Sequence, residues 1–355
     1  MSASKLEFGI EMELYLRPKH PGLENMMKSH GCLAKGNTRE QDRKAFRMAL
    51  TDILEPDIPT QCDVTGNYLK WTVADEDLDE TEATHGYFPC EIVSRVLDSD
   101  GNWDEEIDNM FNALLHNYDL LLTRGCAMHV HVSPHNGTYT LSQLQSILKA
   151  ALYYERALAV IMPAERKDTP WAEPNMRMIR NCEKNINKVP QTTWAPVFNE
   201  IDNCKFIPTL LAHVNCSKRQ VSWNFSNVVN PCGTVEFRRP PGVKSAADAK
   251  HWAALTMGFV AEAMRQDWKA VRTTKTHPST DTLRSVITRG ARSLGSPVQA
   301  VLNPMLMADI NMPATVLSVE ERQKIKQKIE KKAKKHSVFV ENVINSRPNT
   351  PVGHK

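Results

Sequence analysis

The chain contains 355 residues, of which 41% are hydrophobic and 24% are charged, and its formal net charge is +3. This much apolar sequence can bury a large core, which excludes a mainly disordered chain, and the length fits one large α/β domain or two closely joined ones. There is no apolar run of about 18 residues, and the N-terminus is charged where a signal peptide would be apolar, so we expect a soluble, cytoplasmic protein without membrane contacts. Eight scattered cysteines without a CxxC pair predict reduced thiols.

The net charge hides an uneven distribution. Residues 322 to 335 hold eight Lys or Arg and one Glu, a charge of +7, so the overall +3 leaves −4 on the rest of the chain. A nucleic-acid backbone is bound by basic residues spread over a folded face, so this distribution argues against a nucleic-acid-binding core.

The first predicted element is a strand over residues 6 to 16, LEFGIEMELYL, because apolar and polar residues alternate there with a period of two. Residues 18 to 67 are polar and rich in turn formers, and they predict no clear element. Short strands are expected at residues 68 to 73 and 91 to 96. A helix should follow, with Asp104 as its cap and apolar residues at helical spacing.

The middle of the chain predicts a strand, over residues 127 to 133, and then the clearest helix. Thr140 and Gln143 make a capping-box pattern ahead of that helix, and Pro163 is expected to end it. Residues 163 to 220 are rich in Pro and Asn, which predicts loops with short helices, of the kind that frame binding sites.

The next part predicts two strands, near residues 220 to 227 and 233 to 239. A long helix should follow from a capping-box pattern of Ser245 and Asp248. Strands and helices are thus interspersed, without a repeat of fixed period.

Three regions are expected along the chain: a catalytic domain over residues 1–317, a basic helical segment over 318–346 and a disordered tail over 347–355. In the basic segment only Ile325, Ile329 and Ala333 form an apolar stripe, at four-residue spacing. We therefore expect a solvated terminal helix that packs along that stripe and is dispensable for chemistry, with a membrane or nucleic-acid contact as the alternative.

Two carboxylates share one face of the first strand. In FGIEMEL the alternation directs Ile10 and Met12 to the core and Glu11 and Glu13 to the opposite face. Residues two apart on a strand lie about 6.5 to 7 Å from each other. The pair can therefore hold one hard cation between its oxygens or two neighbouring ones, and a solvated strand face is the alternative.

Two later strands repeat this arrangement. In CAMHVHVS, His129 and His131 lie on one face with Ser133, a geometry typical of metal or phosphate contacts. In GTVEFRR, Glu236 and Arg238 share a face. They could form a simple ion pair, or Glu236 could bind Mg²⁺ while Arg238 steadies a phosphoryl group.

The joint pattern is more informative than any one motif. Glu91, in PCEIVSRV, adds another carboxylate in an extended segment. A curved sheet would gather these acids, histidines and arginines into one polar trough. Such a trough suits phosphoryl transfer from ATP, because divalent ions must bridge phosphate oxygens while basic groups neutralise charge.

The order FGIEMEL, CEIVS, CAMHVHVS and GTVEFRRPPG, followed by a helix that contains Trp252, resembles the putative amidoligase family over roughly residues 6 to 260. That family is similar to the glutamine synthetase and glutamate–cysteine ligase superfamily. The resemblance implies an α+β fold with a curved, mainly antiparallel sheet and helices packed on its convex side. It also implies Mg²⁺ and ATP as cofactors and an acyl-phosphate intermediate that an amine attacks.

The resemblance also implies roles for individual residues. The metal ligands would be Glu11, Glu13, Glu91, Glu236 and His129, and His131 would contact the metal or the phosphate. Arg238 would be the phosphate-binding arginine, and Asn224 would line the site. Arg166 would lie near substrate or phosphate, a role for which Arg177 and Arg180 compete.

The implied function is an ATP-dependent carboxylate–amine ligase whose partners are a small-molecule or peptide carboxylate and an amine, and an oligomer is compatible with it. A metal-dependent amide hydrolase could use the same histidines and glutamates to activate water. A non-catalytic binding protein on the same scaffold is the third reading. The retained carboxylates and the terminal ExR motif favour the ligase.

Overall fold

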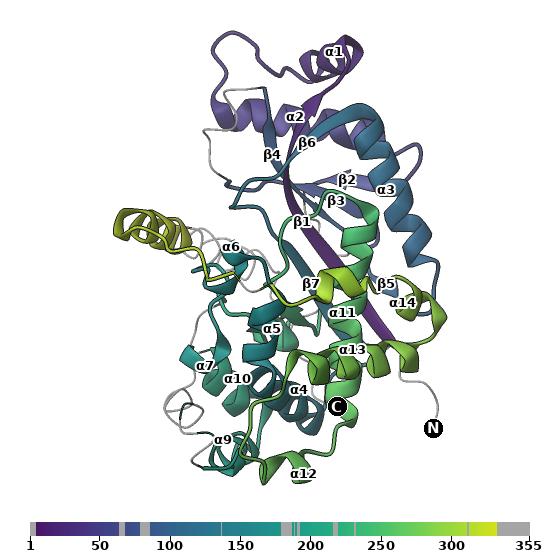
Figure 1. Cartoon of the computed structure of the whole chain (residues 1–355). Helices are drawn as coiled ribbons and strands as arrows, with labels where there is room; N and C mark the ends of the chain where they lie inside the picture. Colours follow the sequence, from purple (N-terminus) through teal and green to yellow (C-terminus); the bar gives the residue numbers. More distant parts are fainter. Residues whose placement is uncertain are drawn as a thin grey trace, which may run out of the picture.

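A computed structural model describes residues 5–63, 68–78, 86–135, 137–178, 187, 189, 192–215, 219–230, 232–310 and 312–331. Its centre is a nine-stranded sheet in which the first strand lies near the middle (Figure 1). The order across the sheet is β2 (Thr60–Cys62), β3 (Trp71–Ala74), β4 (Phe88–Val93), β1 (Leu6–Pro18), β7 (Met128–Pro134), β9 (Val235–Phe237) and β8 (Trp223–Asn224), while β5 (Leu97–Asp98) and β6 (Tyr118–Leu121) also pair with β1. All these pairs are antiparallel except β2 with β3.

Helices pack on one side of this sheet and around its lower half (Figure 1). They are α1 (Pro21–Ser29), α2 (Arg39–Leu54), α3 (Trp103–Asn117), α4 (Leu141–Tyr153), α5 (Glu155–Ile161), α6 (Ala164–Lys167), α7 (Asn175–Met178), α9 (Ala195–Asp202), α10 (Ile207–Asn215), α11 (Ala246–Arg265), α12 (Trp268–Arg272), α13 (Thr280–Leu294) and α14 (Ser296–Ala300), with 3₁₀ turns at Ser226–Val229 and Pro304–Met307. A further helix spans 319–331. The predicted α+β class, with helices packed on a mainly antiparallel sheet, is confirmed.

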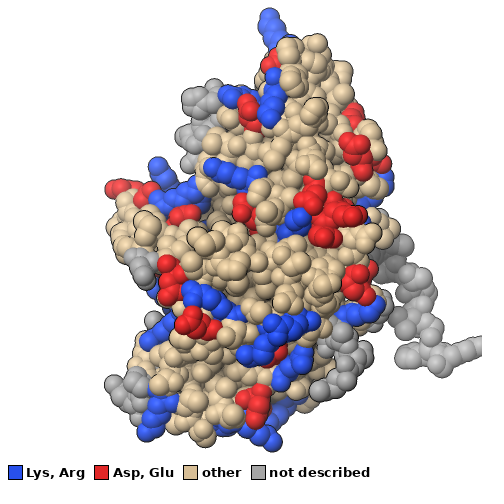
Figure 2. Space-filling model, turned by 45° about the vertical axis from the view of Figure 1, so that its right-hand side comes forward, with Lys and Arg blue, Asp and Glu red and all other residues tan. Residues whose placement is uncertain are grey.

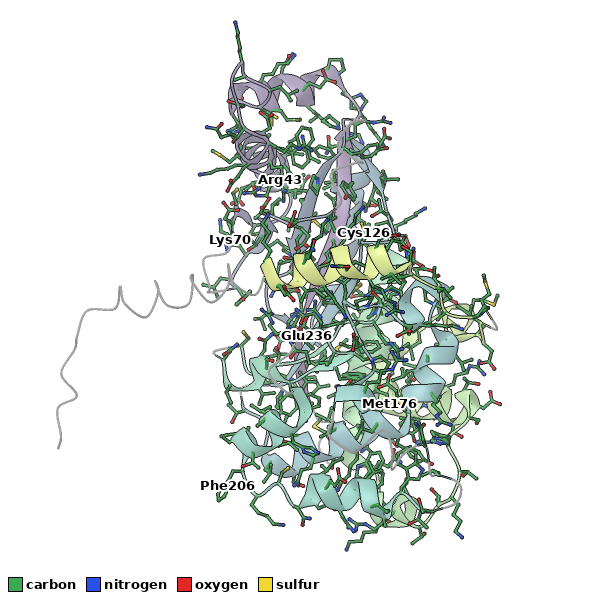
Figure 3. All side chains as sticks on the ribbon, turned by 90° about the vertical axis from the view of Figure 1, so that its left-hand side faces the viewer. Arg43, Lys70, Cys126, Met176, Phe206 and Glu236 are labelled. Carbon is green, nitrogen blue, oxygen red and sulfur yellow. The ribbon has the colours of Figure 1, made fainter. Side chains whose placement is uncertain are left out.

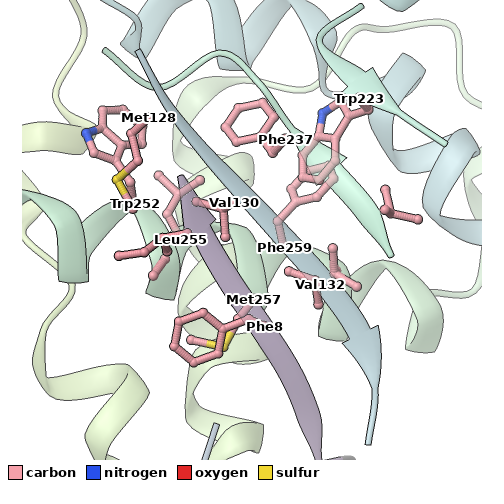
Figure 4. Packing of buried hydrophobic residues seen from close by; sticks show 14 of the residues in the cluster. Phe8, Met128, Val130, Val132, Trp223, Phe237, Trp252, Leu255, Met257 and Phe259 are labelled. Carbon is pink, nitrogen blue, oxygen red and sulfur yellow. The ribbon is translucent and has the colours of Figure 1, made fainter. Parts of the chain in front are cut away.

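Strict alternation in β1 determines where the core lies. Phe8, Ile10 and Met12 are at most 2% exposed, whereas the intervening glutamates face the other side of the sheet. The buried face packs on α11, where Trp252, Leu255 and Phe259 lie against β1, β7 and β9 (Figure 4). Because one face is sealed by α11, the polar face of the same strands is the one left for a binding site.

Helix α11 is held in turn by α13, and the contact depends on two glycines. A Cβ atom at Gly290 would lie 1.8 Å from the carbonyl oxygen of Gly258, and one at Gly258 would lie 2.6 Å from the carbonyl oxygen of Ile287. The two backbones therefore meet directly, which no larger residue permits.

Several predicted elements are confirmed at the residue level. The strand at the start of the chain is β1, and the strand at residues 127 to 133 is β7. The strand predicted at 233 to 239 is present as β9 but is shorter, Val235–Phe237. Thr140 forms the expected capping box with Gln143, and the Ser245 hydroxyl accepts a hydrogen bond from the Asp248 amide. Both helices thus begin where the sequence placed them.

Two predictions about helix ends were wrong. Asp104 does not cap α3, because Asn102 occupies the N-cap position and Asp104 lies in the first turn, where its charge favours the helix dipole. The helix predicted from Thr140 to Pro163 is two helices, separated at Tyr154 with φ −92° and ψ 3°. At the start of α5 the Glu155 carboxylate forms a buried ion pair with Arg239 at 2.7 Å, a tertiary contact without a local sequence signal.

The strand predicted over residues 220 to 227 is shortened to Trp223–Asn224. The Asn224 side-chain oxygen accepts a hydrogen bond from the Ser226 amide at 2.9 Å, and a 3₁₀ turn follows. Asparagine commonly diverts the backbone from a ladder in this way. The strand therefore ends immediately after the residue that enters the site.

The Gly258–Gly290 contact predicts a large stability effect from one added methyl group. Gly290→Ala should destabilise the fold by about 1–3 kcal/mol or more, because the two helices must separate to admit the Cβ. Gly22→Ala is the matched control, since nothing lies within 4 Å of its Cβ position. Thermal unfolding followed by circular dichroism measures both, and equal melting temperatures for the two variants would contradict the account.

Candidate functional site

Strand register aligns the sequence motifs in one row across the sheet. Glu91 on β4 is paired with Glu13 on β1, and Glu11, two residues earlier, is paired with His129 on β7. His131 is paired with Glu236 on β9, and Glu236 with Asn224 on β8. Five strands thus each contribute a polar side chain to the face opposite α11.

His129 lies between two groups of carboxylates. Its Nδ1 atom lies 3.0 Å from Glu11 and 3.7 Å from Glu236, while its Nε2 atom lies 3.9 Å from Glu13. The side chain is only 5% exposed, so these acids are its main polar surroundings. Burial and then the nearby Arg238 lower the pKa of His129 to about 4, against the opposing effect of Glu11 and Glu236. At neutral pH the ring is therefore uncharged and offers a lone pair.

His131 is held differently, by a hydroxyl and a carboxylate. Its Nδ1 atom lies 3.1 Å from the Thr234 hydroxyl, and its Nε2 atom lies 3.1 Å from Glu11. Burial would lower the pKa of His131, but the charges of Glu11 and Glu236 outweigh burial and raise it. The two histidines of one motif thus differ in their tendency to be protonated. His129 is suited to metal ligation, and His131 is suited to contact with an anion.

Glu236 is completely buried and is fixed from both sides. Asn224 donates to its Oε2 atom at 2.7 Å, and Arg238 forms a short ion pair with its Oε1 atom. Burial would raise the pKa of Glu236, but Arg238 and the two histidines outweigh burial and lower it to about 2. The carboxylate therefore stays ionised, and Asn224 acts by orienting it.

The same balance applies to Glu11. Burial would raise its pKa, but His131 and His129 hold it well below the usual range. Two ionised carboxylates thus lie close to an uncharged imidazole, an arrangement that a divalent cation stabilises.

The donor atoms form two groups of metal-ligand type on this face: Glu11 with His129 and Glu236, and Glu13 with Glu91 and His129. Within each group one atom from each residue lies within 4.8 Å of the others. Carboxylate oxygens with a single imidazole fit Mg²⁺ or Mn²⁺. A neutral imidazole has one lone pair, so His129 can ligate an ion in only one group at a time.

A cavity of about 650 Å³ opens over part of this row, and its lining does not include His131, Glu236 or Asn224. Glu11, Glu13, Glu91 and His129 line its inner wall. The rest of the lining mixes the cations Arg124, Arg166, Arg219 and Arg238 with the acids Glu76, Asp77, Glu165 and Asp168, and Trp171 and Leu78 add apolar contacts. The volume and the mixed lining are typical of a site for a charged small molecule.

The three arginines proposed from the sequence have different positions. Arg166 lines the cavity and is 1% exposed, and it donates to the carbonyl oxygens of Arg238 at 2.6 Å and Arg239 at 3.0 Å. It therefore fixes the end of β9, and burial lowers its pKa to about 10. Arg177 is exposed and does not line the cavity, although it pairs with Asp168, which does. Arg180 lies outside the described residues.

Sequence reasoning missed several residues of the cavity. Arg124 precedes the HxH motif on a turn, and Arg219 and Trp171 come from segments without a recognisable pattern. Lys324 and Lys328 come from the basic C-terminal helix, which we expected to be remote from the chemistry. Only the charge of that helix could have signalled its role, and its position depends on tertiary contacts.

A third group of this kind, formed by Glu7, Asp98 and His135, lies at the other end of β1. It is more exposed, and the His135 ring already lies 3.0 Å from Asp98 and 3.3 Å from Glu7. The large cavity does not reach these three residues. They do not belong to the candidate active site.

The carboxylate row predicts a divalent-metal site. Glu11→Gln and Glu13→Gln should each weaken Mn²⁺ binding by at least about tenfold while the melting temperature stays close to that of the wild type, because both side chains face the cavity. Glu262→Gln is the matched control, since that carboxylate pairs with Arg289 at 2.8 Å outside the cavity. Calorimetric titration measures Mn²⁺ binding. If both cavity variants bind Mn²⁺ with wild-type affinity, Glu11 and Glu13 are not metal ligands and only form a solvated strand face.

The surface and the helices add two observations about partners. On the face drawn in Figure 2, Lys and Arg are interspersed with Asp and Glu. Within the part of the chain that the structure describes, every helix is too short or too polar to span a bilayer.

Comparison with known proteins identifies the family. A search of curated proteins finds no match to the chain. A family model described as "Putative amidoligase enzyme" matches residues 4–260, which include every strand of the sheet and all the motif residues that line the cavity. The match covers more than half of the chain, and with the site built from the same four motifs it shows that this protein belongs to the amidoligase family.

Proposed function

We propose that the protein is an ATP-dependent ligase that joins a carboxylate to an amine through an acyl phosphate, with ADP and phosphate as by-products. The observation that carries this proposal is the pairing, in one cavity, of two carboxylate groups around His129 with a set of arginines. The acids around His129 suit metal ions, and the arginines suit phosphate and carboxylate oxygens. The family supports an amide-forming ligase.

The proposal assigns roles to the carboxylates and His129 of the polar strand face. Glu11, Glu13, Glu91, Glu236 and His129 would hold Mg²⁺, which when bound neutralises the phosphate oxygens of ATP. The donor set fits that ion, because four of these five ligands are hard oxygen donors.

Arg238 would steady the phosphoryl group during transfer. One of its terminal nitrogens pairs with Glu236, but its buried Nε–H has no hydrogen-bond partner among the described residues. A buried donor without a partner is costly, and an incoming oxyanion would satisfy it. The guanidinium can therefore hold a metal-binding carboxylate and a phosphate at the same time.

The reaction would proceed in two steps. A substrate carboxylate oxygen attacks the γ-phosphorus in line, and the bond from that phosphorus to the bridging oxygen breaks to release ADP. The amine nitrogen then attacks the acyl carbon, loses a proton and expels phosphate, which keeps one oxygen of the original carboxylate. His131 and Arg238 would stabilise the negative charge in both steps.

Hydroxylamine, a small and strong nucleophile, should replace the natural amine. Full-length protein incubated with Mg-ATP, hydroxylamine and a library of carboxylic acids should give one or more hydroxamates with matching ADP release. Mass spectrometry detects the hydroxamate, and a coupled assay measures ADP. If the folded protein forms neither hydroxamate nor ADP, or if it hydrolyses an amide without consuming ATP, the ligase proposal is contradicted.

Arg238→Ala should reduce hydroxamate formation by about 100-fold or more, because it removes a charge that is needed in the transition state. Arg289→Ala is the matched control, since that guanidinium is on α13 and outside the cavity lining. The control should keep near-normal turnover. Equal rates in the two variants would remove Arg238 from the mechanism.

A further inference from the structure

The chain after α14 is tied to the segment that presents Arg166. The Ile310 amide donates to the Val160 carbonyl at 3.0 Å, and the Thr315 amide donates to the Ala164 carbonyl at 2.9 Å. The Lys167 ammonium donates to the Met312 carbonyl at 2.6 Å. These contacts run along α5 and α6, so the chain reaches the mouth of the cavity before its last described helix begins.

The helix 319–331 begins at a well-defined cap and is held by two ion pairs. The Ser318 hydroxyl accepts from the Glu321 amide at 3.1 Å, and the Glu321 carboxylate accepts from the Ser318 amide at 2.7 Å. Glu321 also lies 3.5 Å from Arg124, and Arg322 lies 3.5 Å from Asp168. Arg124 and Asp168 both line the cavity, so both ion pairs attach the helix to the rim.

One face of this helix forms part of the cavity wall. Glu321, Lys324, Ile325 and Lys328 line the cavity, and their spacing of three, four and seven residues places them on a single helical face. Lys326 lies on the opposite face, away from the cavity. Figure 3 shows the helix in yellow across the middle of the molecule, between the labelled Cys126 and Glu236.

The two lysines in the cavity lining are not neutralised by contact with any residue that the structure describes. Among the described residues, neither the Lys324 nor the Lys328 ammonium forms an ion pair with a carboxylate. The same cavity is lined by Glu11, Glu13 and Glu91, which belong to the candidate metal site. The lysines and the candidate metal ligands thus share the space where reactants would bind.

We propose that the helix 319–331 is the outer wall of the active site, and that Lys324 and Lys328 bind the anionic oxygens of a reactant. Those oxygens belong either to the phosphate chain of ATP or to the carboxylate of the acid. The inference rests on the proposed ligase function and replaces the expectation of a dispensable terminal helix. Lysine suits this role because its ammonium is a compact point charge on a flexible stem.

Charge reversal at single positions of the full-length chain tests this assignment. The variants are K324E and K328E, and K326E is the matched control because it makes the same charge change on the other face of the same helix. Calorimetry measures the Kd of Mg-AMP-PNP. The hydroxamate assay measures KM for the acid that the carboxylate library selects.

Reversal at Lys324 or Lys328 should raise at least one of these constants by about tenfold or more, with a strong dependence on salt, while K326E stays within about twofold of the wild type. A raised Kd assigns the lysines to the nucleotide phosphates, and a raised KM with unchanged Kd assigns them to the acid. If the wild type makes hydroxamate and neither constant changes in K324E or K328E, the inference is overturned and the ligase stands. If the wild type makes no hydroxamate, the proposed function falls and the inference falls with it.

Discussion

The register of β1 between β4 and β7 determines the position of the whole site. It places Glu13 beside Glu91 on one side and Glu11 beside His129 on the other. A shift by one residue would turn both glutamates toward α11 and bring Ile10 and Met12 into the cavity. The apolar half of the strand prevents this, because these side chains are buried against the helices with at most 1% exposed. Burial of one face therefore fixes the chemistry of the other.

This arrangement concentrates charge, and the molecule balances it from several directions. Glu236 is fully buried yet stays ionised, because Arg238 and the two histidines surround it. Glu11 is held by the same histidines. The acids thus form a preorganised cluster that favours divalent ions, and arginines and the C-terminal lysines line the same cavity. In the reaction that we propose, this combination suits reactants that carry phosphate and carboxylate groups.

Local patterns predicted much of the sheet and most of the inner wall. Alternation in β1, β7 and β9 correctly predicted which side chains leave the core, because a strand has only two faces. The ion pair of Glu236 with Arg238, weighed from the sequence as an alternative to metal binding, is present in the structure. The Nε–H of Arg238 has no hydrogen-bond partner in the part of the chain that the structure describes, so the arginine could keep this ion pair and also contact a phosphoryl group.

Other features were missed even where a signal existed. Thr38 and Gln41 make the same capping box as Thr140 and Gln143, and α2 begins there, inside a region that we considered featureless. No local sequence pattern indicates the break at Tyr154 or the packing of the helix 319–331 against the cavity. They depend on contacts between distant residues, such as Glu155 with Arg239 and Thr315 with Ala164. Such contacts must be found in three dimensions.

The central claim is that the substrate carboxylate is activated by phosphorylation inside this cavity. The most direct measurement places ¹⁸O in the carboxylate of the acid and follows the label by mass spectrometry during amide or hydroxamate formation. An acyl phosphate must transfer one labelled oxygen to inorganic phosphate in each turnover, in step with ADP release. Label in AMP would mean an adenylate instead, and unlabelled phosphate in the presence of product would contradict carboxylate phosphorylation.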